Sequence, residues 1–475
     1  MVEFDNALAN ESWVVFQDTD MGETRALLRR FDRHTVSFEH YSLDAVLRVS
    51  QVLANFKIIC RGAAVYSGRV LIRSLINAGA TVLCEATLDD AWIDITALAG
   101  GQAAGLMERY TEFFRKHERF HLISPDYTAA VAGLRNYLED VRLWLDHVAI
   151  GLPEPENRER SQVERDTAWA MRDPIVNTTR TLFERFEETA ARIPENLEPA
   201  CFAYAQRQVR PLLLDAPFVF RTFRKPLGYA GDYMMVAMMF GDPCVGPSLF
   251  ARVLNCYSLD LPPILAHRNR IDYLLGQLER ETLRSIRHRR QARIFNLGCG
   301  PAREVMTFLE RSAAADEARF TLVDFNQETL DDTRRDIDRL CAKHGRRTEA
   351  EFVRKSVQQL LKESARNRAA GTTPQYDLVY CAGLFDYLSD NVCKLLVEIL
   401  WGMVAPGGLL IVTNVDRHSS RAQMECFLEW NLVYRDSRGM RRLAPASVPS
   451  EDVVLKRDET GVNIFLELRK PEHGH

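Results

Sequence analysis

The sequence predicts an α/β protein in which a doubly wound, Rossmann-like domain follows a helical region and a small β domain. Three observations support this fold class. Short apolar strands alternate with amphipathic helices after residue 286, helical periodicity dominates residues 101–285, and glycine-separated apolar runs fill residues 1–100. Because 475 residues are too many for one ordinary core, we expect domains at 1–100, 101–285 and 286–475.

The composition indicates a soluble globular protein, with 46% hydrophobic and 27% charged residues. The formal net charge of −4 gives no global basic field, so we expect no nucleic-acid partner. No stretch approaches the roughly 20 apolar residues of a transmembrane helix, and the acidic N-terminus lacks a signal pattern, which predicts a cytoplasmic location. Ten scattered cysteines without a CxxC pair predict neither a disulfide framework nor a bound metal.

The first two regions each carry recognisable elements. In the first, the runs Val65–Ile76 and Ala80–Cys84 predict strands of a small β domain. In the second, Tyr127–Ile150 and Thr178–Ile193 predict helices, with the charged stretch Pro153–Arg165 as a linker or helix surface. The helical region is interrupted at Arg221–Tyr233, a segment that cannot be plain helix because it contains Pro226, Gly228 and Gly231.

The third region alternates strands and helices in the order typical of a parallel sheet covered on both faces. Between two of the predicted strands lies the amphipathic segment Gln327–His344, which predicts a helix. The predicted strands are Ala292–Leu297, Arg319–Val323, Tyr376–Tyr380 and Leu409–Thr413.

A glycine turn follows the first of these strands. Ala292–Leu297 runs directly into the turn Gly298–Gly300, where a ligand can approach the backbone and meet the N–H groups of the next helix. The next strand ends in Asp324, 26 residues after Gly298, where a carboxylate can accept both hydroxyls of a ribose. The third glycine of the nicotinamide pattern GxGxxG is absent, which disfavours that cofactor.

The motifs NLGCGPA, LVDFN, YDLVYCAGLFDYL and APGGLLIVTN, in this order over about residues 290–415, resemble those of class I S-adenosylmethionine-dependent methyltransferases. The resemblance implies S-adenosylmethionine as cofactor. It also implies roles for matching positions: Gly298, Cys299 and Gly300 beside the methionine part, Asp324 at the ribose, Phe325, Ser356 and Val357 around the adenine, and Ala382 and Gly383 on the methyl-transfer side. Asn296, Ala302 and Ser356 depart from the pattern that is common in this family.

A narrower resemblance rests on KPLGYAGDY, the segment His267–Leu274 (HRNRIDYL), the GCGPARE turn and the segment Phe427–Arg435. Together they are similar to a bacterial family described as extracellular factor 3-hydroxypalmitic acid methyl ester biosynthesis proteins. This resemblance implies methylation of the carboxyl group of a 3-hydroxy fatty acid.

Methyl transfer needs alignment more than acid–base chemistry, and a carboxylate acceptor is ionised at neutral pH. Tyr229 is a candidate to face the sulfonium, and Asp232 to pair with the cofactor ammonium. Arg268 or Arg270 is a candidate partner for a carboxylate. For the segment that contains Tyr229 and Asp232, the alternative is a turn that caps a helix. For the two arginines, the alternative is a solvated helix face. Candidate bases, for an acceptor that requires one, are His418, Asp386 and Glu429.

Two further motifs compete with this interpretation. His117–His121 matches the zinc-protease pattern HExxH, but Arg119 and the neighbouring charges favour a surface helix. Arg29 and Arg33, before the runs of the β domain, resemble the RxxxR of PilZ-like domains, which implies a cyclic di-GMP partner. The second motif of such domains is not matched by Ser74–Gly79, so a β domain that dimerises or gates the substrate is the alternative.

Three hypotheses about function follow. The first is an enzyme that methylates a carboxyl oxygen of a fatty-acid-like small molecule. The second keeps the cofactor but methylates an amine or hydroxyl, or cyclises the cofactor itself. The third is a cyclic-di-GMP-responsive effector that has a methyltransferase fold.

Overall fold

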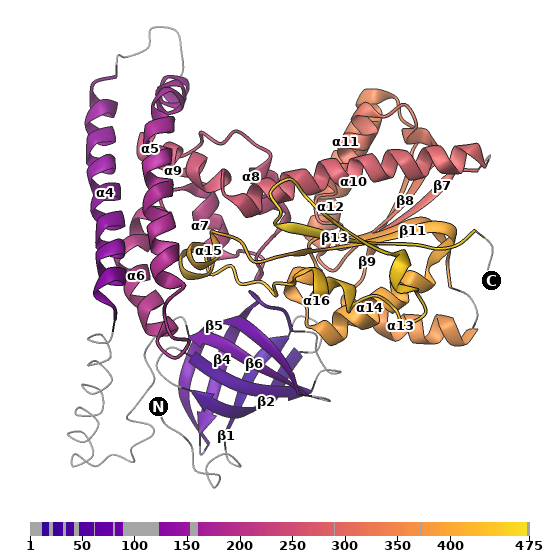
Figure 1. The fold of residues 1–475 in the computed structure, drawn as a ribbon, viewed down its shortest axis with the longest axis horizontal. Helices are drawn as coiled ribbons and strands as arrows, with labels where there is room; N and C mark the ends of the chain where they lie inside the picture. The colour runs from indigo at the N-terminus through magenta and orange to yellow at the C-terminus, as the bar shows by residue number, and fades with distance from the viewer. Residues whose placement is uncertain are drawn as a thin grey trace.

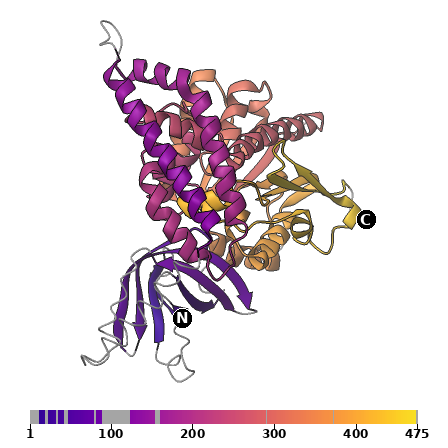
Figure 2. The ribbon, with the colours of Figure 1, turned by 60° about the vertical axis from the view of Figure 1, so that its left-hand side comes forward.

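The computed structural model describes residues 12–18, 22–31, 35–41, 47–60, 62–78, 81–88, 123–152, 160–288, 290–370 and 373–472. These residues form a closed six-stranded barrel, a group of helices and a seven-stranded sheet with helices on both faces (Figure 1). The barrel lies beside both the helices and the sheet, as the rotated view in Figure 2 also shows. This mixed content agrees with the predicted α/β class.

The barrel is antiparallel throughout, with the order β1-β2-β3-β6-β5-β4. Its strands are β1 (Ser12–Asp18), β2 (Gly22–Phe31), β3 (Thr35–Tyr41), β4 (Val52–Cys60), β5 (Ala63–Ala78) and β6 (Thr81–Leu88). It closes around apolar side chains that alternate along each strand, among them Phe16, Phe38 and Phe56, which are fully buried against one another. Strand β5 contains the predicted run Val65–Ile76, and β6 contains residues 81–84 of the run Ala80–Cys84, whose first residue lies outside the described residues.

The helical part begins after the barrel. Its helices are α4 (Pro125–Ile150), α5 (Arg160–Ala190), α6 (Glu198–Leu213), α7 (Pro217–Arg224), α8 (Tyr233–Met239) and α9 (Leu249–Leu259). Helices α4 and α5 lie side by side, and α9, buried along its whole length, packs on α5 (Figures 1 and 2). Helix α5 starts inside the charged stretch Pro153–Arg165, because its charges pair along the helix surface, as Arg160 does with Glu164.

The sheet has the order β12-β13-β11-β10-β7-β8-β9. Its strands are β7 (Ala292–Leu297), β8 (Ala318–Asp324), β9 (Glu349–Arg354), β10 (Tyr376–Cys381), β11 (Val404–Val415), β12 (Val453–Arg457) and β13 (Asn463–Arg469). The first five of these are parallel, and β13 runs antiparallel to both β11 and β12. The limits predicted for the strands β7, β8 and β10 agree with the structure to within one residue, whereas β9, β12 and β13 were not predicted.

Helices cover both faces of the sheet (Figure 1). One layer contains α10 (Pro262–Arg287), α11 (Arg303–Arg311) and α12 (Gln327–His344), and the other contains α13 (Val357–Ala370), α14 (Asp390–Gly402) and α16 (Ser437–Arg441). The short α15 (Arg421–Phe427) packs on α5 and α6 instead, and 3₁₀ turns lie at Ala315–Glu317, Phe385–Tyr387 and Ser450–Asp452. Neighbouring strand residues such as Leu378 and Val379 enter opposite cores, as a doubly wound sheet requires.

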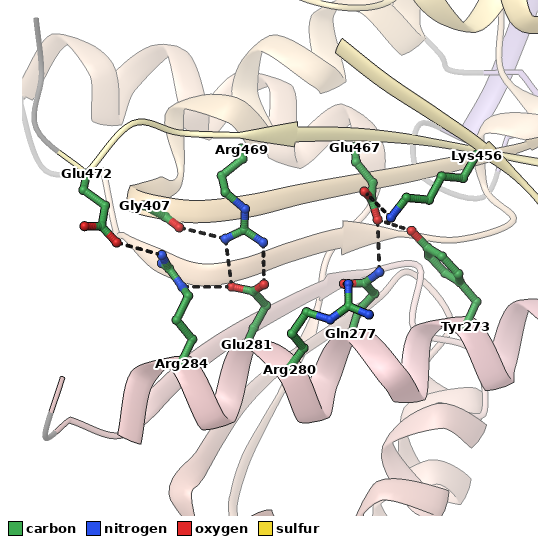
Figure 3. A network of polar contacts seen from close by, with 10 residues as sticks. All are labelled: Tyr273, Gln277, Arg280, Glu281, Arg284, Gly407, Lys456, Glu467, Arg469 and Glu472. Carbon is green, nitrogen blue, oxygen red and sulfur yellow. Dashed lines mark hydrogen bonds and ion pairs between the residues drawn. The ribbon is translucent and has the colours of Figure 1, made fainter. Parts of the chain in front are cut away.

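Helix α10 is fastened to the sheet by polar contacts (Figure 3). The carboxylate of Glu281, which is buried, pairs with Arg469 on β13 at 2.5 Å and with Arg284 at 3.2 Å. Further along α10, Gln277 donates to Glu467 of β13 at 3.0 Å. The contacts hold α10 along the sheet and place its N-terminal half at the carboxyl ends of the strands.

Candidate functional site

The candidate site lies where the strand order of the sheet reverses. After β7 the chain adds β8 and β9 on one side and then β10 and β11 on the other. Parallel sheets bind ligands outside the carboxyl ends of the strands at such a point. A pocket opens there, and the sequence-predicted residues that line it are Tyr229, Arg270, Gly298, Cys299, Gly300, Asp324, Phe325, Val357, Ala382, Gly383 and Asp386.

The glycine turn forms one wall of this pocket. Gly298 and Gly300 have φ angles of +68° and +50°, which side chains with a Cβ adopt at a cost. The N–H groups of Gly298 and Cys299 both donate to the carbonyl of Val323, at 2.8 and 3.0 Å. The turn is therefore tied to the end of β8, and α11 begins directly after it at Arg303.

Asp324 ends β8 with both carboxylate oxygens engaged. Its Oδ2 accepts the N–H of Gly300 at 3.1 Å, and its Oδ1 accepts the N–H of Asn326 at 3.0 Å. Burial raises the pKa of Asp324, while these backbone donors act in the opposite direction. Each oxygen retains a further lone pair, so the carboxylate is fixed in place and can still accept hydroxyl groups from a ligand in the pocket.

Five polar side chains of the pocket wall have buried atoms without a hydrogen-bond partner among the described residues: Arg270, Asn296, Arg303, Thr329 and Asn463. Two of these atoms are Nε of Arg270, on α10, and Oδ1 of Asn296, on β7. The terminal nitrogen of Arg270 lies 2.7 Å from Nδ1 of His267, whose pKa burial lowers well below its usual value, so that the neutral ring can accept. The amide nitrogen of Asn296 donates to Glu304 at 3.1 Å. The Arg270 guanidinium thus offers a cationic donor to a ligand in the pocket, and the amide oxygen of Asn296 offers a neutral acceptor.

Aromatic rings and the barrel complete the pocket. The ring centroid of Tyr229 lies 5.1 Å from that of Phe325, and the Arg48 guanidinium lies 4.1 Å from the Phe325 centroid. Arg48 and Val49 belong to the segment that leads into β4, and the Val49 N–H donates to the carbonyl of Tyr387 at 3.1 Å. Nothing in the sequence around Arg48 marks it as part of a site, and no motif covers it.

Several predicted site residues do not line the pocket. Asp232 caps α8, because it accepts the N–H of Met235 at 2.8 Å, and it pairs with Arg221 at 2.9 Å. Its role in the structure is therefore that of a helix cap, the alternative given above. Arg268 does not line the pocket and donates to the carbonyl of Met239 at 2.7 Å. Ser356, at the start of α13, instead exchanges hydrogen bonds with Gln359. Of the candidate bases, Asp386 lines the pocket, whereas Glu429 and His418 do not.

His418 is partly buried and does not line the pocket. Its Nδ1 lies 3.1 Å from the hydroxyl of Ser420, its ring contacts Tyr434 edge-on, and Nε2 has no hydrogen-bond partner among the described residues. Burial lowers the pKa of His418 from 6.5 to about 4. This environment fits a structural histidine that stays neutral.

A pH-dependent contribution to stability follows. Because the folded-state pKa lies below the unfolded value, the contribution of His418 is present above about pH 6.5 and is lost as the pH falls to about 4. Between about pH 7.5 and pH 5, this group alone should lower the free energy of unfolding by roughly 2 kcal/mol. Urea unfolding at both pH values should show a smaller loss for His418→Gln than for the wild type. Equal losses in the two proteins would contradict this assignment.

The competing motifs fare differently. His117–His121 and Arg33 lie outside the described residues. Arg29, on β2, is half-exposed and donates to Glu39 at 2.7 Å, and the cyclic di-GMP hypothesis remains a prediction.

In the part of the chain that the structure describes, no group of three or more His, Cys, Asp or Glu side chains could hold a metal ion. Within the same ranges, no helix has the length and apolarity needed to cross a membrane.

Comparisons with known proteins give weak likenesses. No family model matches the chain, and no curated protein matches it. Similar solved structures include a possible exported protein from Bordetella parapertussis, with 17% identity over 74% of this chain and 99% of the other and a TM-score of 0.37. Magnesium protoporphyrin IX methyltransferase from Synechocystis, solved with bound SAH, has 9% identity over 57% and 99% and a TM-score of 0.34. An O-methyltransferase family protein from Burkholderia thailandensis has 14% identity over 39% and 52% and a TM-score of 0.28.

Proposed function

We propose that this chain is an S-adenosylmethionine-dependent methyltransferase that methylates a carboxyl oxygen of a fatty-acid-like small molecule. The observation that carries the proposal is the arrangement of the Gly298–Gly300 turn and Asp324 at the point where the strand order reverses. The sequence resemblance predicted these two features. The geometry supports the proposal, because the N–H of Gly300 in the turn donates directly to the carboxylate of Asp324.

The residues of the pocket fit the parts of this cofactor. Asp324 has free lone pairs for the two ribose hydroxyls, and the turn beside it leaves room for backbone approach. The unpartnered Nε of Arg270 and Oδ1 of Asn296 match the carboxylate and the ammonium of an amino acid. When bound, the cofactor would supply an electrophilic methyl group on a sulfonium.

The chain itself needs to align the reactants and exclude water. Tyr229 is partly buried at the pocket, and an aromatic face attracts a cation. Burial raises the pKa of the Tyr229 hydroxyl, so the hydroxyl stays protonated. A carboxylate acceptor requires no general base, which agrees with a pocket whose histidine, His267, is already paired with Arg270.

An apolar wall supports an acyl chain as part of the acceptor. Side chains from α8 and α10 line the pocket next to the polar groups, namely Met235, Val236, Met239, Ile271 and Leu274. Burial of methylenes against such a wall would contribute about 0.8 kcal/mol for each CH₂ group. The carboxyl end of a fatty acid would then meet the polar end of the pocket.

The test incubates the protein with methyl-labelled S-adenosylmethionine and 3-hydroxypalmitic acid, and identifies products by mass spectrometry. We expect a labelled methyl ester, and none in parallel reactions that lack either the acid or the protein. Calorimetry with S-adenosylhomocysteine runs beside it. Absence of cofactor binding would overturn the whole proposal.

The other outcomes separate the parts of the proposal. Cofactor binding without any ester from 3-hydroxypalmitic or palmitic acid would overturn the acceptor while leaving the cofactor. When a cell extract replaces the acid in this reaction, label recovered on the amine or hydroxyl of a compound in the extract would point to the second hypothesis. Label recovered in a cofactor-derived product without any acceptor would reveal cyclisation.

A further inference from the structure

Among the unpartnered polar atoms of the pocket, one belongs to a strand that the proposed cofactor contacts do not reach. Asn463, at the start of β13, is buried and lines the pocket. Its Oδ1 has no hydrogen-bond partner among the described residues. An amide oxygen that is buried and unpaired costs free energy, which a donor on a ligand offsets. This atom is therefore a contact point that remains for the methyl acceptor.

The side chain of Asn463 is held in one orientation. Its Nδ2 donates to the carbonyl of Ala266 on α10 at 2.7 Å. Its backbone N–H donates to Oδ1 of Asp458 at 2.7 Å, and its backbone carbonyl accepts the N–H of Asp458 at 3.1 Å. Because a carbonyl requires a donor, the amide nitrogen must face Ala266, which fixes the position of Oδ1. The residue thus presents one oxygen, already in place, to a ligand.

The sheet order places Asn463 beyond the cofactor contacts. Asp324 ends β8, whereas Asn463 begins β13 and pairs with Val415 at the end of β11. Because β7, β10 and β11 lie between β8 and β13, strand steps of about 4.8 Å separate the two residues by about 19 Å across the sheet. The proposed contacts with the cofactor extend from Asp324 to Asn296 and Gly383, at the ends of β8, β7 and β10. Asn463 therefore lies at the end of the pocket that remains for the methyl acceptor.

This β11 end of the pocket is lined by Asp386, Val415, Trp430, Leu432 and Asn463. Oδ1 of Asp386 accepts the N–H of Val415, the residue that pairs with Asn463, at 2.6 Å. The indole N–H of Trp430 is engaged, since it donates to the hydroxyl of Tyr387 at 2.9 Å. Oxygen atoms beside apolar side chains favour a ligand that carries a hydrogen-bond donor next to an apolar chain.

We propose that Asn463 determines specificity for the methyl acceptor, because its Oδ1 accepts a hydrogen bond from a hydroxyl or ammonium group that the acceptor carries near its carboxyl group. The inference rests on the proposed function, since the acceptor is the acid methylated in this pocket. An acid without such a group would meet the same apolar wall from α8 and α10 but would leave Oδ1 buried and unpaired. It should bind more weakly, because a site built around a hydrogen bond discriminates against ligands that lack the donor.

The test is calorimetry on the full chain in the presence of saturating S-adenosylhomocysteine. The probes are decanoic, 3-hydroxydecanoic and 3-aminodecanoic acid, which share one chain length. We expect the hydroxy or the amino acid to bind at least about 10-fold more tightly than decanoic acid, and the tighter of the two identifies the donor. This comparison in the wild type needs no substitution.

Asn463→Ala tests the residue itself. The substitution removes Oδ1 and should reduce the preference for the donor-bearing acid to within about twofold, chiefly by weakening the binding of that acid. Because the preference compares two ligands of one protein, a loss of folded protein alone would leave it unchanged.

The matched control is Asn269→Ala. Asn269, on α10, donates to Oδ2 of Asp458 at 2.9 Å and does not line the pocket. It therefore contacts the same aspartate as Asn463 without reaching the ligand, and its replacement should leave the wild-type preference intact.

The outcomes separate the inference from the proposed function. Equal affinity of the wild type for the three acids would overturn the inference alone, and Oδ1 would then be paired with water only. A preference that survives in Asn463→Ala would overturn the role of this residue. Failure of all three acids to bind, while S-adenosylhomocysteine binds, would overturn the acceptor class and the inference together. Failure of S-adenosylhomocysteine to bind would overturn the proposed function as a whole.

Discussion

Replacing Asp324 with alanine is expected to weaken binding of S-adenosylhomocysteine by about 100-fold or more. Two hydrogen bonds from ribose hydroxyls to a fixed carboxylate would be lost, each worth roughly 1.5–3 kcal/mol. The N–H groups of Gly300 and Asn326 would lose their acceptor as well, which loosens the glycine turn. Calorimetry measures the affinity, and thermal unfolding reports any loss of structure.

The matched control for this substitution is Asp331→Ala. Asp331 is an exposed carboxylate on α12 that accepts from Gln327 at 2.8 Å and does not line the pocket. Its replacement should leave the affinity within about twofold. If Asp324→Ala binds S-adenosylhomocysteine as tightly as the wild type while the protein stays folded, the assignment of the pocket to this cofactor is wrong.

Replacing Gly383 with alanine is expected to damage the opposite wall of the pocket. Gly383 has a φ of +91°, and an added Cβ would lie 3.0 Å from both terminal nitrogens of Arg270. The strained backbone costs on the order of 1–3 kcal/mol, and the crowded guanidinium, itself buried, must move. We expect at least about 10-fold weaker cofactor binding together with a lower thermal midpoint.

Gly276→Ala gives the control for this change. Gly276 lies inside α10, and an added Cβ would meet nothing within 4 Å. Alanine is there expected to stabilise the helix by roughly 0.5–1 kcal/mol without affecting the pocket. Equal effects of the two substitutions on cofactor affinity would refute the role given to Gly383.

The sequence predicted the parts of the pocket that follow from local pattern. The turn Gly298–Gly300 and Asp324 each come directly after an apolar strand, and parallel strands bring their carboxyl ends to one edge of a sheet. Strand β9 was not predicted, because half-buried and charged residues follow one another in EAEFVR without a strong apolar run. Strands β12 and β13 extend the sheet at its edge and were missed as well.

The choice between neighbouring candidates needed packing. Arg268 and Arg270 stand two positions apart on α10 and so point to different sides of the helix. The sequence admitted both, whereas the contacts of α10 with the sheet turn Arg270 into the pocket and Arg268 toward Met239. Asp232 was likewise ambiguous, since the same carboxylate can cap a helix or bind a ligand, and its contact with Met235 N–H makes it a cap.

The sequence by itself determined the α/β class, the turn at Gly298–Gly300 and the acid at Asp324, because these depend on periodicity and on residues close together in the chain. Only the tertiary structure decided that Arg48 and Trp430 complete the pocket. These contacts join segments far apart in the chain. They depend on how the barrel, helices and sheet pack together, and no local pattern of residues encodes that packing.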